Sequence, residues 1–311
     1  MRFSRTITLA ATLLMLAAGA SAQTSSEDFI RRYNNLQARV GPAGLGMETL
    51  IGQWEEALPE DPQMLLAKFW FNYTRCATTQ VIQLSQDRYL GNEPILPFTD
   101  SLGVKRNFFE DTVYDDDLYR EAESALDRLM GLYPLNLDYI LLKADAMRLY
   151  EKGSPDMTRE MLTSLIDRNY REHPAWVHSE IETVDNEVFE ALIQQQCYNI
   201  FRLGTPSSAE AFKAISEKML VYSKDNPVFM DNIGSYWLVS RKDTKKALKQ
   251  YDMVLKKHPD DVTAIRNCIL AARSAKDVKL EKKYLSMMAR YGESETDRAS
   301  AQARLDALSR K

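Results

Sequence analysis

A histidine motif and several acidic residues are the parts of this sequence whose types could support chemistry. His178-Ser179-Glu180 has the His-x-Glu spacing of zinc-dependent deaminases, in which the histidine binds the metal and the glutamate transfers protons. Such a site also needs a Pro-Cys-x-x-Cys segment that supplies two thiolate ligands, and the sequence contains none. We therefore expect no metal site, and we interpret His173 and His258, which each precede a proline, as turn residues.

Acidic residues cluster between positions 110 and 117, where calcium is the cation to consider. A calcium-binding loop alternates its ligands and needs a glycine at its sharp turn, and Glu110, Asp111 and Asp115-Asp116-Asp117 show neither feature. Carboxylates in the first turn of a helix interact favourably with the positive end of the helix dipole. We therefore interpret this cluster as helix capping and solvated surface.

The sequence has no motif for phosphate binding or for nucleophilic catalysis. Its twelve glycines form neither a G-x-G-x-x-G nor a Walker sequence, and no G-x-S-x-G places a serine on a strand-to-helix turn. We therefore expect a protein that is not an enzyme and has no cofactor. An enzyme with an unrecognised site is our third hypothesis, after the two given below.

A repeated spacing in the sequence predicts the elements that would position any site. Five times, a small or apolar residue is followed by an apolar residue four places on and by a proline twelve places on. The five instances are Leu50-Trp54-Pro62, Ala122-Leu126-Pro134, Leu162-Ile166-Pro174, Ile215-Met219-Pro227 and Ala247-Tyr251-Pro259. The seventh place is apolar in four of them (Ala57, Leu129, Tyr222 and Val254) and is Asn169 in the third.

This spacing puts the apolar residues on one face of a helix, and the proline ends that helix because it is not tolerated in a helix interior. Helices with one apolar face can bury it by stacking on their neighbours, so the pattern predicts an α-solenoid.

The repeat resembles the tetratricopeptide repeat (TPR), whose second helix carries small and aromatic residues and is followed by a proline. Residues 232–259 match best, through Ser235, Leu238, Ala247, Tyr251, Val254 and Pro259. Residues 262–291 match more loosely, because the charged Glu281 stands where a small residue is expected. The resemblance implies an all-α solenoid of stacked antiparallel helix hairpins, as a divergent exported bacterial member of the family.

We expect one helical repeat domain over residues 23–311, with its best repeats at 228–291. The paired helices are predicted at residues 28–39 and 49–58, 62–84 and 118–133, 138–151 and 155–170, 174–201 and 207–223, 228–240 and 244–257, and 262–275 and 278–291. Residues 293–309 are predicted to form a polar C-terminal capping helix. No segment alternates convincingly with the period of a strand, so we expect no sheet.

Residues 89–117 form an irregular insertion, because Gly91, Pro94, Pro97 and Gly103 interrupt any periodicity. Loops of this length are uncommon and are often functional. We predict that the insertion packs back on the helices through its apolar residues Ile95, Leu96, Phe98, Phe108 and Phe109. Just before it lie four aromatic residues, which we interpret mainly as core, with a partner contact as the alternative: Phe69, Trp70, Phe71 and Tyr73.

The first 22 residues have the features of a secretory signal peptide. Arg2 and Arg5 precede an apolar run, and Ala20-Ser21-Ala22 provides the small residues of a cleavage site. We expect export across the inner membrane, with the bacterial periplasm as the best location, and no membrane-spanning helix in the mature chain. Without these residues the chain has 38 basic and 44 acidic residues, a net charge of −6 that argues against nucleic acid as a partner.

The three cysteines are widely spaced and never occur as Cys-x-x-Cys. We interpret Cys76, Cys197 and Cys268 mainly as small buried residues, with one disulfide bond as the alternative.

The preferred hypothesis is a non-catalytic TPR-like scaffold that binds protein or peptide partners in the cell envelope. The first helix of each TPR pair lines the partner groove, and carried onto this chain it implies six partner-binding residues: Asn232, Tyr236, Arg266, Asn267, Leu270 and Arg273. The alternative is a carbohydrate- or lipid-binding envelope module that uses the aromatic cluster and the 89–117 insertion. The oligomeric state is open.

Overall fold

The computed structural model describes residues 25–310, so the predicted signal peptide at residues 1–22 lies outside the described residues. Within that range the chain forms thirteen α-helices, one short π-helix and two β-strands. The mostly helical character is confirmed, whereas the prediction of no sheet is wrong. By internal contacts the chain divides into two compact units, one with the chain up to Gln80 and Asp111–Pro134, the other with Val81–Glu110 and Leu135–Lys311.

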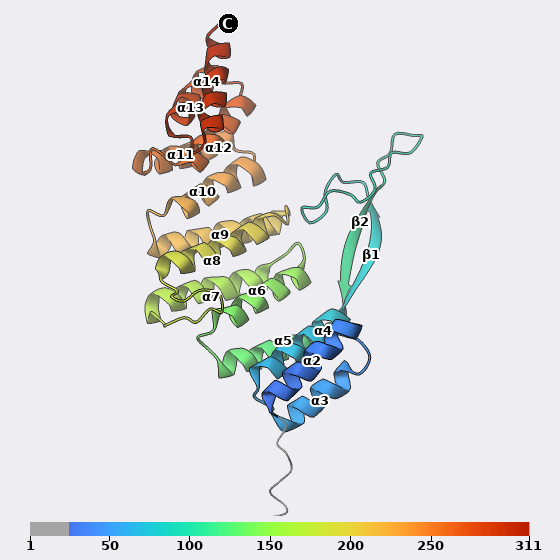
Figure 1. Ribbon diagram of the computed structural model, residues 1–311. Coiled ribbons are helices and arrows are strands. Elements are labelled where there is room, and N and C mark those ends of the chain that lie inside the picture. The colour runs from blue at the N-terminus through green and yellow to red at the C-terminus, as the bar shows by residue number, and fades with distance from the viewer. Residues whose placement is uncertain (1–24, 311) are drawn as a thin grey trace, which may run out of the picture. The chain divides into compact units, whose positions relative to one another are not determined.

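The first unit contains four helices: α2 (Ser26–Val40), α3 (Met47–Ala57), α4 (Pro62–Cys76) and α5 (Asp116–Leu132) (Figure 1). Trp54 of α3 lies at the centre of its core, where its ring stacks on Phe29 with 5.5 Å between centroids. The Trp54 Nε1–H group donates a hydrogen bond of 3.0 Å to Asp61. Asp61 also caps α4 by accepting from the backbone N–H of Gln63. One aromatic side chain therefore joins α2, α3 and the start of α4.

An antiparallel two-stranded ribbon follows α4 directly. Its strands are β1 (Ala77–Leu84) and β2 (Asn107–Tyr114), and the side chain of Gln80 donates to that of Asp111 across the pair. The helix predicted over residues 62–84 therefore ends at Cys76. Apolar residues in β1 have a spacing that also fits a helix, but its threonines, valine and isoleucine favour a strand because β-branched side chains suit the pleated backbone.

The insertion between the strands contacts helix ends within the second unit. Gly91 has a φ of +80° and lies so close to Arg202 that an added Cβ would meet the Arg202 carbonyl oxygen at 1.8 Å. Leu90 lies beside Gly153, and the Thr205 hydroxyl donates to the Gly153 carbonyl. This part of the insertion therefore packs on the turns that follow two helices.

The apolar residues of the insertion divide into two groups. Phe109 is buried and Phe108 is half-buried. Ile95, Leu96 and Phe98 are each about half exposed, at 55%, 56% and 48%. The prediction that all five pack back on the helices is therefore wrong for these three, whose side chains stay about half exposed.

The second unit contains the remaining helices: α6 (Leu137–Glu151), α7 (Asp156–Glu172), α8 (Asn186–Phe201), α9 (Pro206–Tyr222), α10 (Pro227–Ser235), the π-helix η1 (Tyr236–Ser240), α11 (Thr244–Lys257), α12 (Val262–Ser274), α13 (Val278–Tyr291) and α14 (Glu295–Ser309). Helix α6 packs on α7, α7 packs on α9, and from α8 onward each helix packs on the next. Most of these helices begin with a side-chain cap, such as Asp243 on α11 and Asp277 on α13.

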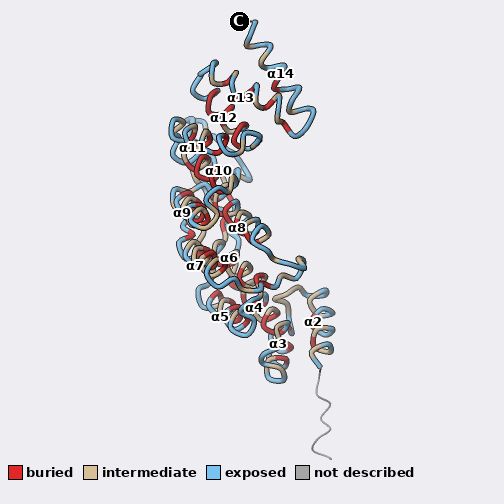
Figure 2. The backbone as a smooth tube through the Cα atoms, turned by 90° about the vertical axis from the view of Figure 1, so that its left-hand side faces the viewer, coloured by how far each residue is buried: buried red, intermediate tan, exposed pale blue. Residues whose placement is uncertain are grey.

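The repeated sequence pattern marks the buried face of every second helix. In all five instances the two residues that lie four places apart are buried, on α3, α5, α7, α9 and α11. Figure 2 shows buried backbone in red along these helices. Two of the five prolines, Pro62 and Pro227, occupy the first position of the following helix. That position suits proline because its missing N–H group would have no partner within the helix.

The fourth predicted pair differs from the structure at its start. A helix was predicted over residues 174–201, but α8 begins only at Asn186. The preceding segment is held in another conformation because Val177 exchanges backbone hydrogen bonds with Leu135 and Leu137. The Trp176 Nε1–H group also donates to Asn169 at 2.8 Å, inside the core.

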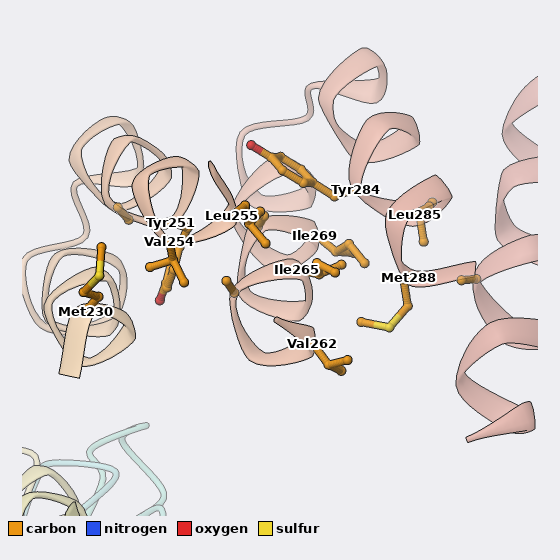
Figure 3. Packing of buried hydrophobic residues seen from close by; sticks show 14 residues of the cluster. Met230, Tyr251, Val254, Leu255, Val262, Ile265, Ile269, Tyr284, Leu285 and Met288 are labelled. Atoms are coloured by element: carbon orange, nitrogen blue, oxygen red, sulfur yellow. The ribbon is translucent and has the colours of Figure 1, made fainter. Parts of the chain in front are cut away.

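The last helices share a continuous hydrophobic core (Figure 3). Tyr251 and Val254 of α11, Ile265 of α12, and Tyr284 and Met288 of α13 all belong to it. Close packing on α10 depends on Gly234, where a Cβ atom would lie 2.4 Å from the Tyr251 ring. The core is therefore built between consecutive helices.

Candidate functional site

A groove of about 670 Å³ lies between α8 and the start of α10, within the second unit. It is lined by Glu187, Glu190, Ala191, Gln194, Gln195 and Tyr198 of α8 and by Asn226, Pro227, Val228 and Phe229 at the beginning of α10. The volume lies within the range of small-molecule and peptide side-chain sites. Carboxylates, amides, one phenol and a few apolar side chains make up this lining, and it includes no lysine or arginine.

Glu190 is held in place by two neutral donors. The Tyr170 hydroxyl donates to one carboxylate oxygen and the Asn226 Nδ2 group donates to the other, both at 2.6 Å. Burial and then the bond to Glu190 raise the pKa of Tyr170 above its usual value, so the hydroxyl keeps the proton that it donates. Asn226 is itself fixed, because its Oδ1 accepts from the backbone N–H of Val228 as the cap of α10. The carboxylate therefore has a defined position.

The amide side chains of the groove are also ordered by partners. Gln194 and Asn232 exchange two hydrogen bonds, of 2.7 and 3.2 Å, and Asn232 also donates to the Ser216 hydroxyl at 3.1 Å. Gln195 donates to Asn199 one turn later at 3.0 Å. An amide both donates and accepts, as a peptide group does, so an ordered row of amides can bind an extended main chain.

Two apolar or aromatic side chains in the groove are exposed. Tyr198 is 51% exposed and Val228 is 42% exposed, and they lie on different helices of the groove. The guanidinium group of Arg202 lies 5.7 Å from the centroid of the Tyr198 ring. Exposed tyrosine is a frequent anchor at protein interfaces because its ring is apolar and its hydroxyl is polar.

Two of the sequence-predicted binding residues are buried below this groove. Asn232 and Tyr236 are 7% and 3% exposed. The Tyr236 hydroxyl donates to Glu210 at 2.5 Å, and Asn232 holds Gln194. Neither side chain presents a free surface, although Asn232 acts on the groove indirectly through Gln194.

Three others line a different hollow, of about 190 Å³, beside α12, α13 and α14. They are Arg266, Leu270 and Arg273. Arg266 lies 3.9 Å from Asp297, and the Nε–H group of Arg273 donates to Glu281 at 2.8 Å.

The sixth, Asn267, contacts the side chain of Tyr251. The structure therefore does not bring the six residues together, and their role in partner binding stays a prediction.

The sequence interpretation missed the groove of α8, although one signal was present. Residues 194–196 are three consecutive glutamines on a predicted helix, in which Gln196 is buried and the other two face the groove. Hydrophobic periodicity identifies the apolar faces of helices and gives no signal for amide side chains. This row of glutamines was therefore indistinguishable from ordinary polar surface.

The His178-Ser179-Glu180 motif lies in a loop that contacts Asp138 at the start of α6. His178 Nε2 lies 3.4 Å from Asp138, and Ser179 donates to the same carboxylate through its backbone N–H and its hydroxyl. Between residues 25 and 310, no group of three His, Cys, Asp or Glu side chains is placed to hold a metal ion. All three cysteines are buried thiols without a disulfide bond, in agreement with the preferred interpretation.

The aromatic cluster before the ribbon is mostly core, as predicted. Phe69 and Phe71 are buried, Tyr73 stacks on Phe69, and Trp70 is 42% exposed.

No family model matches the sequence, and no curated protein is significantly similar to it. Among the helices of the described range, none combines the length and the apolar content needed to cross a membrane.

Proposed function

We propose that this protein is an exported, TPR-like helical-repeat scaffold that binds protein or peptide partners in the cell envelope. The observation that carries the proposal is the alternation of helices. The five repeats place their buried residues on α3, α5, α7, α9 and α11, and the groove is formed by two of the intervening helices, α8 and α10. Stacked helix hairpins form an extended surface on which partners can bind, and the groove lies on the part of that surface formed by the intervening helices.

The groove suits an extended peptide. Ordered amides from Gln194 and Gln195 can pair with main-chain groups, and Tyr198 with Val228 can contact side chains. We propose no catalysis there, because the lining residues include no serine, cysteine, histidine or lysine that could pair as nucleophile and base.

Site-specific photocrosslinking in the producing cells tests this function. A photoreactive amino acid is placed at Tyr198, in the groove, or at Met157, which lies on α7 outside the groove and is also 51% exposed. We expect crosslinked partners, identified by mass spectrometry in the envelope fraction, from position 198 and not from position 157. Equal adducts from both positions, or a protein that stays in the cytoplasm, would contradict the proposal.

A second candidate function has support from the tip of the ribbon. Phe98, Leu102 and Val104 are exposed there, with Leu102 at 86%. The turn satisfies its own backbone, because one Asp100 carboxylate oxygen accepts from the N–H groups of Leu102 and Val104 at 2.9 Å each. Satisfied backbone groups and exposed apolar side chains favour contact with a lipid surface.

Vesicle flotation with phosphatidylcholine, with and without phosphatidylglycerol, tests this candidate. Leu102→Asp should abolish any flotation of the wild-type protein, whereas Leu45→Asp, at a leucine that is 92% exposed elsewhere, should not. A wild-type protein that does not float would remove the lipid hypothesis.

A further inference from the structure

We propose that the groove between α8 and α10 selects peptide segments that carry a lysine or arginine side chain. This inference rests on the proposed function and names the chemistry of the partner. It starts from Glu190, which forms no ion pair with any described residue, although its carboxylate is held by two hydrogen bonds from the uncharged Tyr170 and Asn226.

A second carboxylate reinforces the negative charge of the groove. Glu187 is exposed, also lines the groove and lies three residues before Glu190 on the same helix. Residues three apart on a helix are neighbours, and like charges at that spacing repel each other. A cation bound between the two carboxylates relieves that repulsion, and no lysine or arginine of the lining supplies one.

The remaining lining fits the stem of a long cationic side chain. Lysine and arginine pack their methylene groups on apolar surface while the charged end stays hydrated. Val228 and the ring of Tyr198 offer such surface, and Gln194 and Gln195 lie on the same helix as the two glutamates. A peptide can therefore place its main chain on the amides and one cationic end at Glu190.

The sign of the charge distinguishes this groove from two other hollows of the protein, whereas a third, of about 480 Å³ at the start of α4, is also lined by carboxylates, those of Glu60 and Asp61. The hollow of about 630 Å³ between α2 and α3 is lined by Arg32 and Arg39, and no acidic residue lines it. The hollow at α12–α14 contains Arg266 and Arg273 with one aspartate. Cationic peptides are therefore expected to prefer the α8–α10 groove to the two arginine-lined hollows, and acidic peptides are not expected to bind in it.

Selection from a displayed library of random heptapeptides tests the inference on the purified protein. We expect the recovered peptides to be enriched in lysine or arginine. The variant Glu187→Gln/Glu190→Gln should lose this enrichment, and the matched control Glu160→Gln, at an exposed glutamate of α7 outside the groove, should keep it. Circular dichroism melts confirm that the variants are folded.

Fluorescence anisotropy with the best labelled peptide then measures the contribution of one carboxylate. Glu187→Gln should weaken binding by about fivefold at low salt, the size of an exposed ion pair, and the loss should shrink at high salt because ions screen it. Glu187→Lys, which needs no change in the core, should shift the recovered peptides toward acidic residues.

The outcomes separate the inference from the function on which it rests. A library that yields no bound peptide at all contradicts the proposed peptide-binding function together with the inference. Peptides that bind but show no cationic preference, or a preference that the double variant retains, overturn the inference alone.

Discussion

Asp231 of α10 is a carboxyl group in a position that disfavours its charge. Its side chain is 4% exposed, and one of its oxygen atoms has no hydrogen-bond partner in the protein. Burial, and then the nearby carboxylate of Asp261 at the start of α12, raise the pKa of Asp231 to about 8. The group is therefore expected to hold its proton at neutral pH.

Replacing Asp231 with asparagine should stabilise the protein, increasingly so at higher pH. An aspartate whose folded pKa lies above its unfolded value of 3.8 loses stability as the pH rises from about 4 to about 8, because the unfolded chain releases the proton more easily. Asparagine cannot ionise, so the difference in unfolding free energy should grow by up to about 1.4 kcal/mol per pH unit in that window.

Urea unfolding at pH 5, 7 and 8.5 measures this difference. The control is Asp260→Asn, at an exposed aspartate that precedes Asp261 in the sequence. Its unfolding free energy should change with pH in the same way as that of the wild type. Parallel curves for Asp231→Asn as well would show that the carboxyl is not protonated in the native state.

At the scale of elements, two residues depart from the repeat pattern and serve the packing of their helices. Asn169 replaces the apolar seventh residue on α7, and it bonds to Trp176 and to Asn186 at the start of α8. Glu281 on α13 is 4% exposed and accepts from Arg304 and Arg273. The hydrogen bond from Arg304, and after it that from Arg273, lowers the pKa of Glu281, although burial by itself would raise it. The charged carboxylate therefore connects α12, α13 and α14.

Alanine substitution at two glycines, one on α10 and one on α3, is expected to have opposite effects on the stability of the protein. Gly234→Ala should destabilise the protein by about 1–3 kcal/mol, because the new methyl group would overlap the Tyr251 ring. Gly52→Ala, within α3 and with no atom near its Cβ position, should stabilise by up to about 1 kcal/mol through helix propensity.

Urea unfolding of both variants at one pH checks the pair. The double variant Gly234→Ala/Tyr251→Leu should recover part of the loss, since the smaller side chain makes room. Equal effects of the two alanines would show that α10 and α11 do not approach as closely as the structure has them.

At the scale of the whole molecule, each of the two compact units is built mainly from contacts between helices that are close along the chain. In the second unit, α12 packs on α11 and α13, and α13 packs on α14. Stability in such an arrangement is close to a sum of local terms and interfaces between neighbours. A defect is therefore expected to act near its own position.

Met288→Ala tests this locality. Met288 is 5% exposed in the core of α11–α14, and its truncation should cost about 2–5 kcal/mol locally. Hydrogen exchange followed by mass spectrometry should show faster exchange in α12, α13 and α14, with α6 and α7 unchanged. Equal acceleration in α6 and α7 would show that the second unit opens as one cooperative body.

The amino-acid sequence by itself determined where most of the helices lie and which face of the five repeat helices is buried. The spacing of Leu162 and Ile166, like that of the other four pairs, identified buried residues because helical periodicity and the hydrophobic effect act locally. The predicted helix boundaries were wrong where the apolar spacing of a β-branched segment, such as residues 77–84, fits both a helix and a strand. There the pairing with residues 107–114 decided that the segment is a strand.

Only the tertiary structure decided which polar residues meet. Asn232 looked like a groove residue from its repeat position, yet it is buried and orients Gln194 of another helix. Glu190 became a candidate because Tyr170 and Asn226, from two different elements, converge on it. Periodicity assigns a residue to a face of its own helix, whereas a site depends on distances between helices, and those are set by packing across the chain.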